Sequence, residues 1–458
     1  MVTRRKDIPI RRKVAWTALV LVLAACVAEG FNLGVGVIER AGWIDTHRQD
    51  ARVSFVESDN FTLDPTGEFI VLSDYSNKHM ATDLVVPVDK GGAWRIATTG
   101  GSLIRGMPYN SATTGAELPG TMQFWMRAWL TEGGDGRRYE VIDAGVSGQD
   151  SGRMAQMLPE LLRMDPDVMV ISAGNNEGNI PPFRILEFLH RQPAFRLAIQ
   201  ALLEEPGRAD RPLWIPQDPE TERITARFRH NLEAMIGACR QAGVPLVLVV
   251  EPINLRYTPR PSDPIFHRDP RDLWGACVWE GAEIYRHGQA AEALELLRSC
   301  EDQDAALLWI GNSLYELGRY DEARAILRQA VELYPLLRTR PSLNDEARRI
   351  AAASEGVVLV DVEAAVNAAS PHGVPGESLF VDMCHLNWLG YAIMADAILT
   401  ALDEHGLAPG FDPSRIRRTV EEVAAEAVLP ELGPGASWLE GGRSASGSVP
   451  AGGPGDAG

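Results

Sequence analysis

Ser102 is the residue of this chain best placed to act as a nucleophile, because it lies in a glycine turn, TTGGSLIRG, that follows a short apolar stretch. A serine after two glycines is in most proteins an ordinary turn residue. Serine attack on an ester carbonyl needs a base for the hydroxyl proton, a carboxylate that orients the base, and donors for the developing oxyanion. The rest of the chain must therefore supply these three groups.

A histidine far downstream supplies the base. His385 stands in the sequence VDMCHLN, and Asp382 precedes it by three residues. An imidazole accepts a proton near neutral pH, and the carboxylate of Asp382 is placed to hold the required tautomer. Cys384 is adjacent to the histidine, and we expect its thiol to point away from the imidazole ring and to pack as an apolar side chain.

Two loops between these segments supply the oxyanion donors. The first is GVSGQD, which begins at Gly145, and the second is GNNE, which begins at Gly174. We expect the backbone amides of Ser102 and Gly148 and the side-chain amide of Asn176 to be the donors. Glycine suits this role because a residue without Cβ lets the backbone approach a substrate closely.

A parallel sheet would bring these loops together. Strand-like segments are predicted at 94–98, 139–144, 168–173, 246–251 and 357–362, and helical patterns at 121–130, 151–164, 222–242, 344–353 and 386–402. This alternation indicates an α/β fold whose parallel sheet is covered on both faces. Ligands of such sheets bind at the carboxyl ends of the strands. Glu251 and Asn254 end the fourth strand, and we expect them to line the same cleft.

The motifs GGSL, GVSG, GNNE and DMCH, in this order, resemble the four sequence blocks of the SGNH (GDSL-type) hydrolases. The resemblance covers about 94–251 and 342–405. It implies a flavodoxin-like sheet in a three-layer α/β/α arrangement and activity on acyl esters without a cofactor. It also implies nucleophile Ser102, base His385 oriented by Asp382, and the oxyanion donors named above. A branch with a membrane anchor and tetratricopeptide segments is most similar.

Two positions depart from the family pattern. Gly101 replaces the aspartate of the GDS motif, and Glu177 replaces the aspartate of the usual GxND motif. Neither position does covalent chemistry, so we still expect activity. The orientation of Asn176 is the feature that these departures affect.

One interval of about 90 residues interrupts the alternation and is too long for a connection. Within it, small residues recur as in a tetratricopeptide repeat, with a degenerate copy before it, so we predict an all-α insertion. The matching residues are Gly311, Gly318, Tyr320, Ala323, Ala330 and Pro335, preceded by Gly288 and Ala293. An ordinary helical hairpin is the alternative interpretation.

The N-terminus combines a basic and an apolar segment. Residues 1–13 carry six basic side chains and Asp7, a local charge of +5, and the uncharged run 14–28 follows. With its continuation after Glu29, this run is long enough for a membrane helix, and the preceding charges place the body outside. A cleaved secretory signal and a lipoprotein with Cys26 as the lipidated residue are the alternatives.

These patterns divide the chain into seven segments: 1–13, basic and cytoplasmic; 14–38, membrane anchor or signal; 45–93, a short β preface; 94–256, the first part of the hydrolase domain; 271–338, the tetratricopeptide-like helical insert; 342–405, the second part of the hydrolase domain; and 430–458, a disordered tail. The tail is rich in glycine, proline and serine, which do not bury enough apolar surface to offset the entropy of ordering.

Composition excludes several function classes. The net charge is −18, so the chain after residue 13 carries −18 − 5 = −23, which disfavours a nucleic-acid partner. The five scattered cysteines favour neither a zinc site nor a disulfide-stapled fold, and the histidines show no metal-ligand spacing. We therefore expect no cofactor and no metal.

Three functions remain open at this point. The first is a membrane-tethered serine ester hydrolase of the bacterial inner membrane, with its catalytic body on the periplasmic or extracellular side and an acyl-enzyme intermediate. Its substrate would be an acyl ester of a lipid, a small molecule or a glycan. The second is an O-acyltransferase or deacetylase acting on cell-envelope polysaccharide. The third is a catalytically inactive scaffold that binds a protein partner through the tetratricopeptide-like insert.

Overall fold

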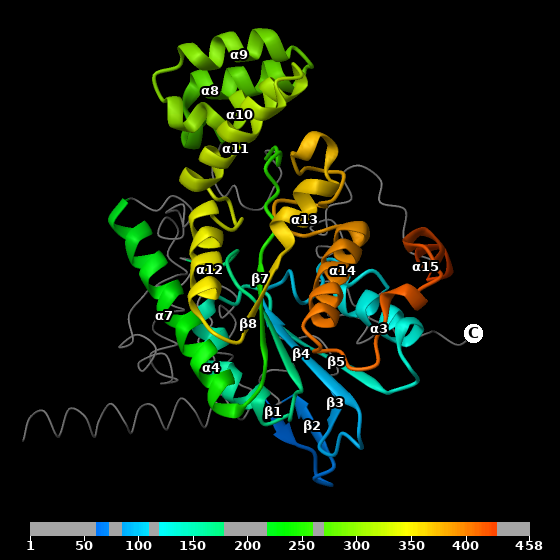
Figure 1. Ribbon diagram of the computed structural model, residues 1–458. Coiled ribbons are helices and arrows are strands. Elements are labelled where there is room, and N and C mark those ends of the chain that lie inside the picture. The colour runs from blue at the N-terminus through cyan, green and yellow to red at the C-terminus, as the bar shows by residue number, and fades with distance from the viewer. Residues whose placement is uncertain (1–60, 73–84, 110–118, 178–217, 260–269, 428–458) are drawn as a thin grey trace, which may run out of the picture. The chain divides into compact units, whose positions relative to one another are not determined.

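A five-stranded parallel sheet lies at the centre of the computed structural model (Figure 1). Its strands are β4 (Trp94–Gly100), β5 (Tyr139–Gly145), β6 (Val168–Ser172), β7 (Leu246–Val250) and β8 (Val357–Asp361). They lie in the spatial order β5-β4-β6-β7-β8, and all neighbours are parallel. Numbered by sequence, this is the order 2-1-3-4-5 of flavodoxin-like sheets. The predicted fold class is therefore confirmed.

The structure describes residues 61–72, 85–109, 119–177, 218–259 and 270–427. The predicted basic segment, membrane anchor or signal, and C-terminal tail lie outside these residues, as do parts of the predicted β preface. Within the described ranges, no helix has the length and apolar character needed to cross a membrane.

Helices cover both faces of the sheet, because successive strand residues point to opposite sides. Ile96 and Val170 join a core with α3 (Met122–Gly133), α13 (Val362–Ala369) and α14 (Trp388–Glu404). Ala97 and Ile171 join a second core with α4 (Ser151–Leu162), α7 (Asp218–Ala242) and α12 (Pro341–Ala353). The two groups of helices lie on opposite sides of the strands in Figure 1, which makes three layers.

In the described residues that precede the parallel sheet, three short strands pair in antiparallel fashion. They are β1 (Phe61–Leu63), β2 (Phe69–Leu72) and β3 (Val85–Pro87), in the order β1-β2-β3. Phe61 and Val86 belong to the core on the α4 side. The backbone N–H of Phe61 also donates to Glu160 Oε2 over 3.1 Å, which ties this small sheet to α4.

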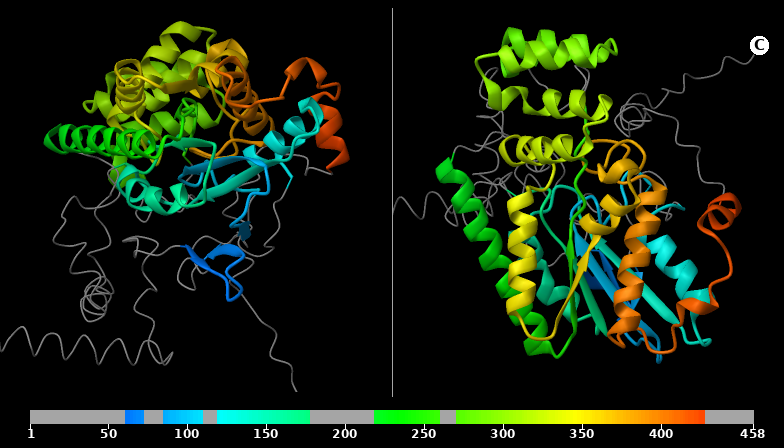
Figure 2. Two further views of the ribbon diagram at one scale, coloured as in Figure 1. Left: turned by 60° about the horizontal axis from the view of Figure 1, so that its bottom comes forward. Right: turned by 45° about the horizontal axis from the view of Figure 1, so that its top comes forward.

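Between β7 and α12, the described part of the chain forms four helices, which make up the all-α region. They are α8 (Pro270–Arg286), α9 (Ala290–Ser299), α10 (Gln303–Glu316) and α11 (Tyr320–Leu333). Figures 1 and 2 show them stacked beyond the end of β7, and we call them the helical insert. Their core includes Ile253, Leu255 and Val374. The insert therefore shares apolar contacts with segments of the sheet domain.

The two hairpins of the helical insert repeat the same packing at an offset of 30 residues. A Cβ on Gly281 would lie 2.5 Å from Leu297, and one on Gly311 would lie 2.5 Å from Leu327. Each glycine thus lets the helices of its hairpin approach closely. This repetition agrees with the residue pattern from which the insert was predicted, and its assignment as tetratricopeptide repeats stays a prediction.

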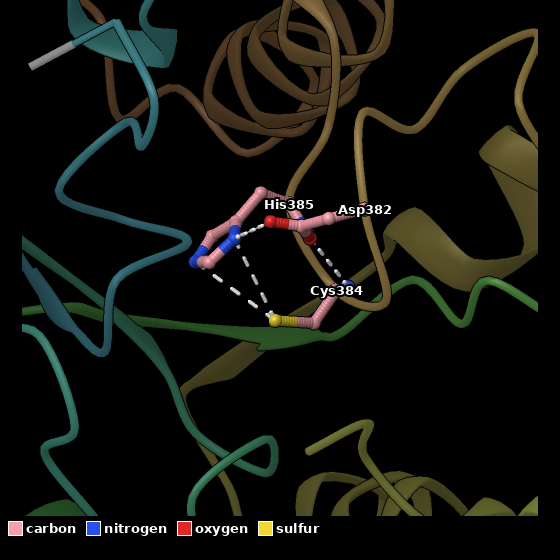
Figure 3. Close-up of side chains that lie close together, drawn as sticks. All are labelled: Asp382, Cys384 and His385. Carbon is pink, nitrogen blue, oxygen red and sulfur yellow. Dashed lines mark hydrogen bonds and ion pairs between the residues drawn. The ribbon is translucent and has the colours of Figure 1, made fainter. Parts of the chain in front are cut away.

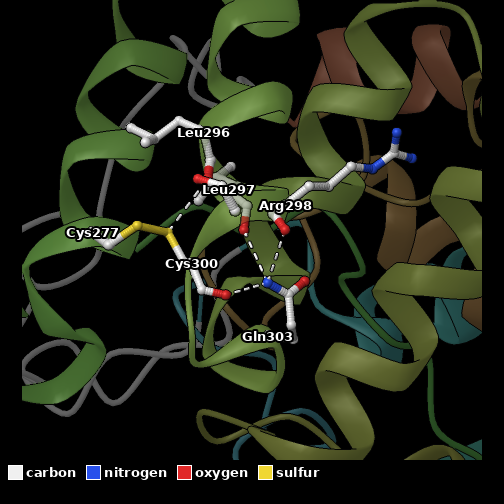
Figure 4. The surroundings of a disulfide bond; sticks show 7 residues. Cys277, Leu296, Leu297, Arg298, Cys300 and Gln303 are labelled. Atoms are coloured by element: carbon white, nitrogen blue, oxygen red, sulfur yellow. Dashed lines mark hydrogen bonds between the residues drawn. A yellow bond between two sulfur atoms is a disulfide. The ribbon is translucent and has the colours of Figure 1, made fainter.

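A disulfide joins Cys277 of α8 to Cys300 at the end of α9 (Figure 4). Their Cα atoms are 5.8 Å apart, within the usual range for a disulfide. Sequence spacing did not favour disulfide bonding, and that prediction is wrong for this pair. Cys300 follows Cys277 at a sequence separation of 23, and the chain reverses direction between α8 and α9 over this interval. Only the packing of α8 on α9 therefore brings the sulfur atoms together.

Candidate active site

Ser102, His385 and Asp382 form a continuous chain of hydrogen bonds at the carboxyl end of the sheet. Ser102 lies two residues after the end of β4, and its Oγ lies 2.7 Å from His385 Nε2. The other ring nitrogen, Nδ1, lies 2.7 Å from Asp382 Oδ2 (Figure 3). The histidine and the aspartate are buried, whereas Ser102 is partly exposed. The structure therefore brings together the three predicted catalytic residues, with the hydroxyl on the accessible side.

Backbone hydrogen bonds fix the loop that carries the base. An antiparallel bridge joins Phe380 to Leu386, and the N–H of Val381 donates to the carbonyl of His385 over 3.0 Å. Within this closed loop, Asp382 Oδ1 accepts the backbone N–H of Cys384 at 2.9 Å and that of His385 at 2.8 Å. The carboxylate is thus held by its own loop, and only Oδ2 remains for the imidazole.

Charge and burial shift the pKa values of His385 and Asp382 in opposite directions. Burial is the largest single influence and would lower the pKa of His385, but the charge and hydrogen bond of Asp382, together with the interactions of Cys384, outweigh it and hold the pKa well above its usual 6.5. Burial alone would raise the pKa of Asp382, but the charge of His385 and the N–H donors hold this pKa below its usual value. The carboxylate is therefore ionised and stabilises an imidazolium.

Cys384 lies against the imidazole, contrary to the prediction that its thiol points away. Its Sγ is 3.8 Å from both ring nitrogens of His385 (Figure 3). The reason is that Asp382 binds two successive N–H groups and so curls the loop. Burial raises the pKa of the Cys384 thiol, which keeps it protonated. The thiol thus packs as a neutral side chain, although in a position that differs from the prediction.

The same three side chains offer ligand atoms within 4.8 Å of one another, which is close enough for a metal ion. Both imidazole nitrogens, however, are already hydrogen-bonded, Nδ1 to Asp382 and Nε2 to Ser102. A metal would have to displace one of these partners. The geometry is that of a proton-transfer chain.

The predicted oxyanion donors lie in loops that follow β4, β5 and β6. Gly148 has φ +74°, a conformation that favours glycine, and a Cβ there would meet nothing within 4 Å. Among the described residues, the backbone amides of Ser102 and Gly148 donate no hydrogen bond. Asn176 Nδ2 donates to the carbonyl of Gln149 over 3.1 Å, which joins the second loop to the third.

Gly101 makes room for Asn176. A Cβ on Gly101 would lie 2.6 Å from Asn176 Nδ2, closer than real Cβ contacts allow. The departure from the aspartate of GDS is thus linked to the position of the asparagine amide, since any larger residue would displace this amide. Sequence comparison with the family pattern identified both positions, but not their contact.

Glu177, the second departure, anchors the start of α4. Its carboxylate accepts the backbone N–H of Ser151 at 2.6 Å and the hydroxyl of the same residue at 3.0 Å. Asn231 donates to that hydroxyl over 3.0 Å. Burial and the charge of Asp150 raise the pKa of Glu177 to about 8. The residue beside Asn176 is therefore tied to α4.

Glu251 supports the loop that follows β6. It was predicted to line a cleft, but it is buried instead. Only 1% of its surface is exposed, and burial raises the pKa of its carboxyl group. It accepts hydrogen bonds from Ser172 Oγ at 2.9 Å, from the backbone N–H of Asn175 at 2.7 Å and from Thr339 Oγ1 at 3.2 Å. The carboxylate thus orders the loop that carries Asn176, the predicted side-chain donor.

Asn254 is also buried, with 3% of its surface exposed, so it does not line the cleft either. Its Nδ2 donates to the backbone carbonyl of Asp382 over 2.6 Å, which holds the loop of Asp382 and His385 against the segment after β7. The carbonyl of Asn254 in turn accepts from the buried Arg338 at 2.9 Å. The residue therefore connects the segment after β7 with the loop of the predicted base.

The segment that leaves the helical insert reaches the same region, a contact that sequence reasoning missed. The backbone N–H of Thr339 donates to Asn175 Oδ1 over 2.7 Å. Burial lowers the pKa of the neighbouring Arg338 to about 10. The partners of Thr339 are 164 and 88 residues away in sequence, so no local pattern indicated them.

A serine hydroxyl, an imidazole and a carboxylate in series at the carboxyl edge of a parallel sheet form the arrangement that serine acyl-transfer enzymes use. The chain belongs to the GDSL-like lipase/acylhydrolase family, whose model matches residues 100–393. The predicted family is therefore confirmed, and with it an ester hydrolase in general terms. No curated protein matches the chain at a significant level.

Three solved structures illustrate what the chain is similar to. An acetylxylan esterase from Geobacillus stearothermophilus is 12% identical, with 72% of this chain and 100% of that chain covered and a TM-score of 0.36. A lipase/acylhydrolase from Enterococcus faecalis is 14% identical, with 71% and 100% covered and a TM-score of 0.34. A GDSL-like lipase from Bacteroides thetaiotaomicron is 13% identical, with 70% and 93% covered and a TM-score of 0.32.

Proposed function

We propose that the protein is an exported, membrane-tethered serine esterase that cleaves acyl esters through an acyl-enzyme on Ser102. The observation that carries the proposal is the pair of 2.7 Å contacts that link Ser102 Oγ to His385 and His385 to Asp382. A nucleophile within hydrogen-bonding reach of a base, which is itself oriented by a third group, is the signature of an activated serine.

The residues define each step of the proposed reaction. Ser102 Oγ attacks the acyl carbonyl carbon while its proton passes to His385 Nε2, and Asp382 stabilises the imidazolium. The oxyanion accepts hydrogen bonds from the amides of Ser102 and Gly148 and from Asn176 Nδ2. When the intermediate collapses, Nε2 returns the proton to the leaving alcohol. Water then attacks the acyl-enzyme with the same base, which releases the acid and restores the serine hydroxyl.

The direct test is hydrolysis of p-nitrophenyl acetate together with labelling by a fluorophosphonate, which reports activation of the serine without a choice of substrate. We expect Ser102→Ala to abolish both. The matched control is Ser299→Ala, because this exposed serine at the end of α9 bonds only to the carbonyl of Leu296. Equal hydrolysis by wild type and Ser102→Ala would refute the assignment.

Two observations support an exported location. The first is the sequence of residues 1–38, where basic side chains precede an apolar run. The second is the disulfide between Cys277 and Cys300, because such bonds persist in oxidising compartments and are rare in the bacterial cytosol. Fractionation of cells that express the full chain tests the proposal, with Cys26→Ser added to distinguish a lipoprotein from a membrane helix. Recovery of all protein in the cytosolic fraction would contradict it.

Acyl transfer and protein binding remain the alternatives to hydrolysis. A transferase would use the same acyl-enzyme but a sugar hydroxyl in place of water. Product analysis with a glycan present separates the two, since a transferase acylates the glycan faster than water hydrolyses the donor. A scaffold function would instead predict that a partner is retained by Ser102→Ala and that wild type shows no fluorophosphonate label.

A further inference from the structure

A cavity of about 290 Å³ lies where the helical insert meets the sheet domain. Its walls come from three segments: α8 and α10 of the insert, the stretch after β7, and the loop that precedes the catalytic aspartate. The lining residues are Tyr285, Tyr315 and Glu316 from the insert, Arg256 and Thr258 after β7, and Pro371, Val374, Gly376, Glu377 and Ser378 from the loop. None of these residues belongs to the site described above.

The charges of the cavity disfavour an anionic ligand. Among the described residues that line it, Arg256 is the one cation, and Glu316 and Glu377 are two carboxylates. The guanidinium is already engaged, because Nη2 lies 2.6 Å from Glu316 Oε1 and Cζ lies 3.5 Å from the centre of the Tyr315 ring. A phosphate or carboxylate would therefore meet more negative than positive charge.

The polar groups instead suit a neutral ligand with many hydroxyls. The carboxylate of Glu377 is exposed and accepts hydrogen bonds, while Ser378 and Thr258 both donate and accept. Burial and the charges of Glu316 and Glu377 raise the pKa of Tyr285 despite the charge and hydrogen bond of Arg256, so the phenol stays protonated and can donate to a ligand. Tyrosine rings add apolar surface beside these polar groups.

The Nε atom of Arg256 is buried and has no hydrogen-bond partner among the described residues. A buried donor without an acceptor is costly, and such groups are rare in folded proteins. Because this Nε atom is shielded from solvent, a ligand oxygen would reach it only after a shift of the Arg256 side chain.

The cavity and the predicted catalytic loop are built from the same two segments. Asn254, which supports Asp382, precedes Arg256 by two residues, and the N–H of Arg256 donates to the carbonyl of Pro375 over 3.0 Å. Ser378 is four residues from Asp382, so their Cα atoms are at most about 14 Å apart. A ligand of a few linked sugar units is long enough to span that distance.

We propose that this cavity binds a sugar unit of the substrate, so that the ester hydrolysed is an acyl group on a neutral glycan. The inference rests on the proposed esterase function and names its substrate class. The helical insert would then supply part of the substrate-binding surface, through Tyr285, Tyr315 and Glu316.

Binding to the inactive full chain tests this inference without any need for turnover. The Ser102→Ala protein is titrated calorimetrically with cellotetraose, xylotetraose, mannotetraose and chitotetraose at millimolar concentrations, and with inorganic phosphate. We expect saturable binding of at least one tetrasaccharide and none of phosphate. Glu377→Gln, which keeps the shape of an exposed loop residue, should weaken that binding by about tenfold or more.

Glu355→Gln is the matched control, because this exposed glutamate lies before β8 and is not among the cavity residues. Tyr315→Leu is a second cavity variant, and circular dichroism checks that it folds. The inference is overturned if no tetrasaccharide binds, if only phosphate binds, or if Glu377→Gln and Glu355→Gln bind equally well. Fluorophosphonate labelling of wild type is scored separately. Labelling without sugar binding refutes the cavity assignment alone, and sugar binding without labelling refutes the esterase.

Discussion

Asp382→Asn is the most informative single substitution in the predicted catalytic chain, because the structure dictates how the new amide must turn. In the wild type, Oδ1 accepts two backbone N–H groups and Oδ2 faces His385 Nδ1. An asparagine will place its oxygen toward the two N–H donors, since the opposite orientation sets its NH₂ against them. Its NH₂ then donates to Nδ1, which must lose its proton.

The consequence is an imidazole in the wrong tautomer. With Nδ1 unprotonated, the proton resides on Nε2, which lies 2.7 Å from Ser102 Oγ and then donates to this hydroxyl instead of accepting from it. The same change in another serine hydrolase lowers kcat by about 10⁴. That factor corresponds to about 5 kcal/mol of transition-state free energy. We expect a loss of this size here, because the imidazolium also loses its charge partner.

The assay is kcat for p-nitrophenyl acetate at a pH where the wild type has reached its plateau, with circular dichroism to show that the variant folds. Asp304→Asn is the matched control, since this exposed residue lies on α10 of the helical insert. A folded Asp382→Asn protein that keeps more than about a tenth of wild-type kcat would refute the tautomer reasoning.

Four further predictions follow from the contacts described above. The wild-type kcat/KM should rise with pH, with an apparent pKa above the usual imidazole value of about 6.5, because the pKa of His385 is raised and only the neutral ring is a base. A pH–rate profile whose apparent pKa lies at or below 6.5 would contradict this. Gly101→Ala should lower kcat by up to about 10²–10³-fold, the loss that removal of one oxyanion donor causes, because the new Cβ displaces the Asn176 amide. An unchanged kcat in the same ester assay would show that the new Cβ does not displace this amide. Cys277→Ser should lower the free energy of unfolding, measured in urea, by about 3 kcal/mol. Wild type should show the same decrease only when a reducing agent is present. In the folded protein the pKa of Glu177 is about 8 against an ordinary 4.5, so the free energy of unfolding of wild type should fall as pH rises between these values. The melting temperature of Glu177→Gln should therefore exceed that of wild type by a margin that grows with pH. A margin that stays constant with pH would argue against the raised pKa.

Much of this arrangement was predictable because it depends on local sequence. Runs rich in β-branched residues mark the buried strands, and the glycines that end β4 and β5 mark where the chain turns at the sheet edge. The spacing of Asp382 and His385 also indicated their pairing. The strand order came only from the family resemblance, since no residue pattern in β5 shows that it pairs outside β4.

The contacts that sequence did not reveal join segments far apart in the chain. The disulfide depends on how α8 packs against α9, and burial of Glu251 depends on Thr339, which arrives from beyond the helical insert. The position of Cys384 depends on a turn that only the two N–H contacts of Asp382 define. In each case the deciding interaction is a tertiary geometry with no counterpart in composition or periodicity.

The hydrogen bonds of Thr339 also decide whether the helical insert is a separable module. Removal of 271–338 with a short linker would leave Thr339 free to move away, and the Glu251 carboxylate and Asn175 would each lose a buried partner. Loss of ester hydrolysis in such a truncated variant would then report a collapsed donor loop and would say nothing about partner binding. Shortening the insert while keeping 334–340 in place is the informative deletion, and transplanting the insert between relatives should follow the same boundary.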